Sequence, residues 1–172
     1  LTTEDTGSFN VAVGYLALTS QNADDTYNVA VGYEAGKSIT TGPYNTIVGS
    51  KSGDALTTGD SNTVLGYNAL STEDTGDKNV AIGYEALNAL NFDGSAYNVA
   101  IGYQAGHDIS SGIFNTIIGG LAGDKITTGV RNTILGYDAG GALTEGNQSV
   151  AIGDGALATA TTQSFNTAVG SF

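Results

Sequence analysis

This chain of 172 residues contains no cysteine, methionine or tryptophan, a single proline and few basic residues. Without cysteine it can form neither a disulfide nor a thiolate metal site. No stretch approaches the roughly twenty consecutive apolar residues that a membrane helix needs. We therefore expect no direct insertion into a membrane, while the redox compartment stays open.

Positive charge is also scarce, because 5 Lys and Arg residues stand against 17 Asp and Glu residues, which gives a formal net charge of -12. Such a surface repels phosphate backbones and anionic lipid headgroups. Nucleic acid is therefore excluded as an expected partner. The carboxylates lie mostly in variable segments, where they keep the protein soluble and could attract cations.

What the chain does contain is one repeated phrase, which reads NVAIGYQAG from Asn98 to Gly106. Its first residue recurs at Asn10, Asn28, Asn45, Asn62, Asn79, Asn98, Asn115, Asn132, Ser149 and Asn166. Seven of the nine intervals are 17 residues long. A fixed period of this length predicts units that bury their apolar sides on their neighbours, so we interpret residues 1–172 as one repeat domain. Both ends cut a repeat, and we expect the chain to be an internal piece of a longer fibre chain.

Two columns of the repeat carry the core prediction, when the first residue of each phrase is counted as position zero. Position three is always aliphatic, and position five is usually Tyr. Because side chains alternate along a strand, positions one, three and five share one face. We predict that position three is the core ladder, formed by Val13, Val31, Val48, Leu65, Ile82, Ile101, Ile118, Leu135, Ile152 and Val169.

Glycine occupies position four in every copy, and a glycine inside a strand marks a bend or the close approach of another backbone. With the Asn at position zero and the small apolar residue at position two, it forms a second, small face. We predict that another copy of the chain packs on this face. The glycines are Gly14, Gly32, Gly49, Gly66, Gly83, Gly102, Gly119, Gly136, Gly153 and Gly170.

The rest of each repeat predicts a weaker, outer strand with one inward Ile or Leu at position eleven, followed by a return turn. A Gly three residues before the next phrase is available for a positive φ in that turn. The predicted fold is all-β, a parallel β-solenoid (β-roll or β-helix) of about ten 17-residue coils. Stacked at the strand spacing, the coils make a rod on the order of 45 Å long, along which the Asn residues form an amide ladder.

The phrase, with its Thr-Thr-Gly turn, resembles repeats of phage tail fibres and related virion fibre proteins. Its Val-Ala-Ile-Gly core, as in Val80 to Gly83 and Val99 to Gly102, is also similar to the head repeats of trimeric autotransporter adhesins. Either resemblance implies a homotrimer that displays binding surfaces outside a cell or virion. The adhesin heads use a shorter coil, so the longer period here favours the fibre variant.

No motif indicates catalysis. His107, the only histidine, lies in a variable connection, and no Ser is singled out by an orienting partner. Acidic pairs are weak candidates for Ca²⁺, with Asp24, Asp25, Glu73 and Asp74 as possible ligands, although a solvated surface explains them better. The aromatic columns could bind sugars, but rings that stack on one another as structural ladders are the preferred interpretation.

We therefore predict a non-catalytic structural segment of an extracellular, cell-surface or virion fibre, without a cofactor, that spaces or presents adhesive surfaces. Its expected partners are further copies of itself and a host-cell receptor or glycan. The first alternative is a trimeric adhesin head that binds host matrix or glycan directly. The second is a solenoid that binds Ca²⁺, or ice through its threonine rows.

Overall fold

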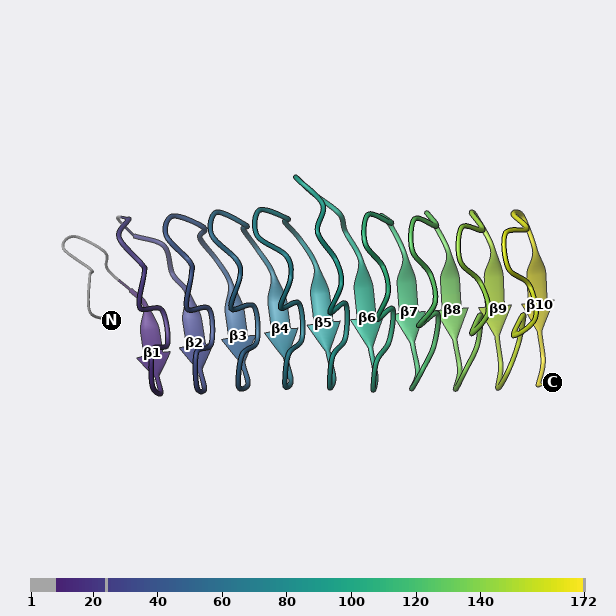
Figure 1. The fold of residues 1–172 in the computed structure, drawn as a ribbon, viewed down its shortest axis with the longest axis horizontal. Coiled ribbons are helices and arrows are strands. Elements are labelled where there is room, and N and C mark those ends of the chain that lie inside the picture. Colours follow the sequence, from purple (N-terminus) through teal and green to yellow (C-terminus); the bar gives the residue numbers. More distant parts are fainter. Residues whose placement is uncertain (1–8, 24, 172) are drawn as a thin grey trace.

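Residues 9–23 and 25–171, which the computed structural model describes, form a parallel β-solenoid (Figure 1). Each coil contributes one strand of three residues. The strands are β1 (Val11–Val13), β2 (Val29–Val31), β3 (Thr46–Val48), β4 (Thr63–Leu65), β5 (Val80–Ile82), β6 (Val99–Ile101), β7 (Thr116–Ile118), β8 (Thr133–Leu135), β9 (Val150–Ile152) and β10 (Thr167–Val169). They pair in chain order into one ten-stranded parallel sheet, which confirms the predicted fold. No helix within the described ranges is suited to crossing a lipid bilayer.

The predicted asparagine ladder runs along the inside of the rod. The backbone N–H of Asn115 donates to Oδ1 of Asn98 at 3.0 Å, and Asn132 repeats this bond to Asn115 at 2.9 Å. The side-chain amide of Asn98 also donates to the carbonyl oxygen of Gly112 at 2.8 Å. Each Asn therefore ties the start of one strand to the next coil and to its own return turn. Because these amides are fully buried, their hydrogen bonds are what make burial tolerable.

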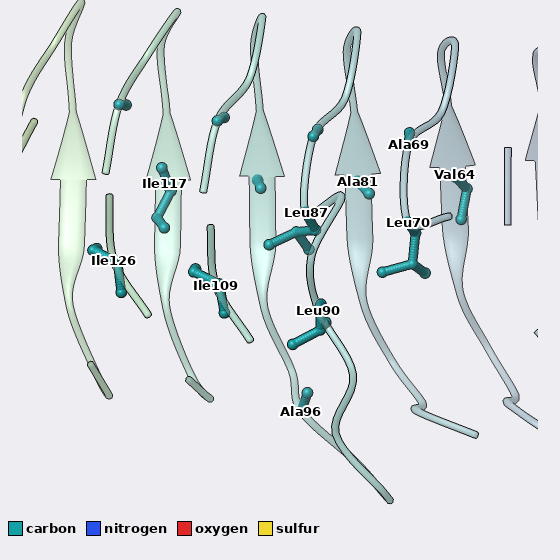
Figure 2. Packing of buried hydrophobic residues seen from close by; sticks show 14 of the residues in the cluster. Val64, Ala69, Leu70, Ala81, Leu87, Leu90, Ala96, Ile109, Ile117 and Ile126 are labelled. Carbon is teal, nitrogen blue, oxygen red and sulfur yellow. The ribbon is translucent and has the colours of Figure 1, made fainter. Parts of the chain in front are cut away.

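The core lies between the sheet and the opposite wall of each coil (Figure 2). Position two of each strand points inward, as Ile117 does, and the wall supplies residues such as Leu87 from position eight and Ile109 from position eleven. All three are fully buried. Since the buried Asn occupies position zero, strand alternation places position two on the same inner side.

The predicted core ladder at position three is wrong, because this column lies on the outside of the coil. Val13, Leu65, Leu135 and Val169 are 55%, 46%, 43% and 73% exposed. The other six members, Val31, Val48, Ile82, Ile101, Ile118 and Ile152, are only half-buried. The face expected to fill the rod instead covers its exterior.

The glycine column at position four marks a close backbone approach, but between successive coils of one chain. Gly102 has a φ of 139°, and a Cβ built there would overlap the carbonyl oxygen of Gly119 in the next coil. The same overlap recurs at every glycine of this column from Gly14 to Gly153. From the coil of β2 to the coil of β9, positions zero and two are buried inside their own coil. The predicted inter-chain face of small residues is therefore also wrong.

The second strand predicted in each coil is not found in the described residues, where turns fill this segment. Several turn residues adopt the left-handed conformation, including Glu34 at a φ of 56° and Leu87 at 50°. Backbone hydrogen bonds still join the coils here, as from the N–H of Gly106 to the carbonyl oxygen of Ala122 at 3.0 Å. The glycine of the return turn is not the left-handed residue. That conformation falls on the residue before the Asn, such as Phe114 at 60°.

One connection projects beyond the others, between β5 and β6 (Figure 1). It follows Asn88 and carries the exposed residues Asn91 and Asp93. Behind it, Asp77 and Ser95 form an isolated parallel bridge that restores the stacking of the return turns. This is where the sequence has its longest interval between phrases, so the insertion loops out while the strands keep their register.

Candidate functional site

The most distinctive surface of the rod is the exposed side of the sheet, which we call the outer face. It consists of positions one and three of each strand, flanked by two edge columns. The edge before the strands comprises Phe9, Tyr27, Tyr44, Ser61, Lys78, Tyr97, Phe114, Arg131, Gln148 and Phe165. The edge after the strands comprises Tyr15, Tyr33, Ser50, Tyr67, Tyr84, Tyr103, Gly120, Tyr137, Asp154 and Ser171.

The rings of both edges stack along the rod. Tyr67, Tyr84 and Tyr103 form a run with ring centroids 5.4 and 5.3 Å apart. On the other edge, Tyr97 stacks on Phe114 at 5.6 Å. These distances follow from the strand spacing, because one ring per coil brings each ring over the next. The predicted structural stacking is thus confirmed, and yet each of these rings remains 41–54% exposed.

In the edge before the strands, two of the four positions that lack an aromatic residue carry a cation. The ammonium of Lys78 lies 5.6 Å from the ring centroid of Tyr97, and the guanidinium of Arg131 lies 5.2 Å from that of Phe114. Both are cation–π distances. Lys78, Arg131 and Asp154 are the only charged residues among the forty positions of the outer face. The acidic excess of the chain therefore lies almost entirely on the other surfaces.

The residues considered for metal binding do not converge. Asp24 lies outside the described residues, and Asp25 is exposed. Glu73 is fully buried, and its carboxylate accepts backbone hydrogen bonds from Gly76 at 2.7 Å and from Phe92 at 3.0 Å. Asp74 is only half-buried beside it. In the described part of the chain, no group of three or more His, Asp or Glu residues is arranged to hold a metal ion.

Glu73 takes the place that Ile or Leu occupies at position eleven of other coils. Burial raises the pKa of its carboxyl group above the ordinary value, although hydrogen bonds from the backbone of Phe92, Gly76 and Thr75 act in the opposite direction. Because its oxygens are engaged by backbone N–H groups, this carboxylate serves to join the turn of its own coil to the projecting connection of the next.

His107 belongs to a small polar cluster on the side of the rod. Its Nδ1 lies 2.6 Å from Oδ1 of Asp108, and its Nε2 lies 3.7 Å from Oε2 of Glu85. Glu85 also accepts a hydrogen bond from Gln104 at 2.8 Å. These contacts link neighbouring coils, and no hydroxyl nucleophile is paired with the imidazole in them. The side chain of His107 therefore contacts the neighbouring coil through Glu85.

The fold defines this chain as a parallel β-solenoid repeat protein. Comparison with protein-family models, with curated proteins and with solved structures found no match. Its function must therefore be argued from the rod and its surfaces.

The outer face was missed because both faces of the phrase are apolar, so alternation could not show which one points inward. One signal was available at position one, where Thr replaces Val in half of the coils. Thr46 and Thr63 are exposed in the structure. A column that accepts a hydroxyl so readily is more typical of a solvent-facing surface than of a closed core.

Proposed function

We propose that this chain is a structural, non-catalytic segment of an extracellular or virion fibre, such as a phage tail fibre, which spaces or presents adhesive surfaces. The observation that carries the proposal is the unbroken register of the stack. All nine neighbouring strand pairs match residue for residue, as Val99 pairs with Thr116 and Ile101 with Ile118. A stack of this kind gives length and stiffness along one axis.

The contacts between successive coils support the same proposal. Strand hydrogen bonds, the Asn ladder and stacked rings all run along the rod, so each coil is held by the one before and the one after it. The adhesin-head alternative shares this rod and differs in that its own surface would bind the host matrix or a glycan. The exposed tyrosine rings are the feature that favours that alternative.

Deletion of one whole coil tests the spacer role. Removing residues 115–131 takes out 17 residues with β7 and rejoins Phe114 to Asn132, which restores the sequence of a return turn followed by a phrase. We expect a folded rod that is about 5 Å shorter by small-angle X-ray scattering, since one strand spacing is lost. Removing only residues 115–122 breaks the period and should prevent folding. A compact particle in place of a rod would contradict the proposal.

A separate experiment tests whether the protein lies outside the cell or in a virion. Antibodies raised against this chain should label filaments that project from cells or virions of the source organism in immunogold electron microscopy. Labelling confined to the cell interior would contradict an extracellular or virion fibre.

A further inference from the structure

We infer that the outer face is covered by the outer faces of further copies of this chain, so that the rods assemble side by side around a common axis. This inference deepens the fibre proposal by naming the partner and the surface, and it rests on that proposal only in taking the rod to work as part of an assembly. The surface itself is argued from exposure, size and charge.

Its size matches a stable interface. The sheet extends about 45 Å along the rod, and the seven residues from one edge column to the other span roughly 20 Å at most. The outer face therefore covers on the order of 900 Å², compared with about 800 Å² per partner in a standard protein interface. The largest apolar patch of an ordinary monomer is about 300–600 Å². Twelve of the forty positions of the outer face are Thr, Ser, Gln, Lys, Arg or Asp. The apolar part is therefore smaller than the whole face and lies near the upper end of this range, and it includes Leu65 and Leu135 at 46% and 43% exposure.

The distribution of charge favours this face and no other. Copies of a chain with a net charge of -12 repel one another over most of their surfaces. On the outer face, the three charged residues are two cations and one carboxylate, Lys78, Arg131 and Asp154. Carboxylates such as Glu34 and Glu85 only border the face, beside its edge residues Tyr33 and Tyr84, so contact through this face brings together fewer acidic groups than contact through the other surfaces. Aromatic residues and Arg are also the types most enriched in interfaces.

The repeat explains why the partner is the same chain. A partner that covers the whole outer face must be flat, apolar and about as long as the rod, and must present side chains at the same strand spacing. Another copy has all of these properties, because it has the same sequence and the same fold. Three such faces, each roughly 20 Å wide, would enclose an axis about 6 Å from each sheet, close to half of the roughly 10 Å that separates packed sheets. The width therefore suits the homotrimer expected from the sequence.

The test replaces two exposed leucines of the outer face with charge. In Leu65→Glu/Leu135→Glu, both side chains point away from the core, so the coils should still fold. Multi-angle light scattering at micromolar concentration should give three times 17.3 kDa for the unchanged chain and 17.3 kDa for the variant. The matched control is Thr58→Glu/Thr128→Glu, which adds the same charge at exposed turn positions. It should keep the mass of the unchanged chain.

Circular dichroism and small-angle scattering separate the two proposals. A monomeric variant that remains a rod of unchanged length supports both the interface and the spacer role. If the double variant does not fold, Tyr103→Glu/Tyr137→Glu at the edge provides the same test. A monomeric unchanged chain would overturn the interface while leaving the spacer role standing. So would an unchanged mass in both outer-face variants, or a monomer whose outer face instead binds a soluble polysaccharide.

Discussion

At the scale of single residues, the buried polar side chains join successive coils by hydrogen bonds, and the apolar side chains fill the core. Asn at position zero and Glu73 are buried because each satisfies backbone groups that the turns leave unpaired. Ser149 shows what the ladder minimally requires. It takes the place of Asn, and its Oγ accepts the backbone N–H of Asn166 at 3.3 Å, whereas the equivalent bonds from a backbone N–H to an Asn Oδ1 are 2.7–3.1 Å long. A hydrogen-bonding side chain at this position therefore matters more than its exact length.

Glu73 predicts a specific pH dependence of stability. Burial raises the pKa of this carboxyl group in the folded chain, so the protonated form is favoured more in the folded state than in the unfolded state. Its stabilising contribution is fully present below the unfolded pKa, near 4.5, and is lost as the pH rises through the folded pKa. Each pH unit between the two pKa values corresponds to about 1.4 kcal/mol.

Glu73→Gln removes this titration. We expect the free energy of unfolding of the unchanged chain, measured by urea denaturation, to rise relative to that of Glu73→Gln as the pH falls from 7 to 4. Glu145→Gln removes one carboxylate from an exposed turn, so it controls for the general loss of negative charge. Parallel pH curves for the unchanged chain and Glu73→Gln would contradict the prediction.

At the scale of the coil, several coils fill the core by exchanging volume between positions two and eight. In the coil of Ala81, the small residue at position two is matched by Leu87 at position eight. Where the strand contributes Ile117, the wall has Gly123, whose missing Cβ would lie 3.4 Å from that isoleucine. Leu87 also fills the space beside Gly106 in the next coil.

Two glycines of the same coil give a matched prediction about backbone approach. At Gly119 a Cβ would overlap the carbonyl oxygen of Gly136, and its φ of 139° strains any L-residue. Gly119→Ala should therefore lower the free energy of unfolding by about 3 kcal/mol or more. At Gly120 a Cβ would only meet the ring of Tyr137 at 3.5 Å, so Gly120→Ala should change it by less than about 0.5 kcal/mol. Equal effects in urea denaturation would refute the assignment of this column to coil stacking.

The sequence was sufficient for the parallel solenoid, the coil boundaries, the Asn ladder and the stacked rings, because each repeats once per coil. It was insufficient to show which side chains of each strand point into the core and which point to solvent. Strands of three residues, such as Val99–Ile101, give alternation too little length to compare two apolar sides. The turn that replaces the second strand was also hidden, because Glu34 and Leu87 adopt left-handed conformations that their residue types do not signal. Which side of the sheet is the outer face became clear only from the burial of positions zero and two.

At the scale of the whole molecule, the rod carries its acidic excess away from an outer face that is nearly free of charge. Side-by-side assembly must bring rods with a net charge of -12 each close together, although their contact surface is apolar. The repulsion acts between exposed charges across solvent, and salt screens such interactions over about 10 Å at 0.1 M and about 3 Å at 1 M. Apolar burial is not weakened by sodium chloride in this way.

Salt should therefore strengthen the association of the unchanged chain. We expect the midpoint concentration for assembly, measured by light scattering over a dilution series, to fall at least severalfold between 0.02 M and 0.5 M sodium chloride. The contrary result, dissociation as salt is added, would mean that attraction between opposite charges holds the copies together. Replacing both cations of the outer face, in Lys78→Gln/Arg131→Gln, separates these cases. If the contact is apolar, the variant should keep the same direction of salt dependence, because the repelling carboxylates remain outside the interface.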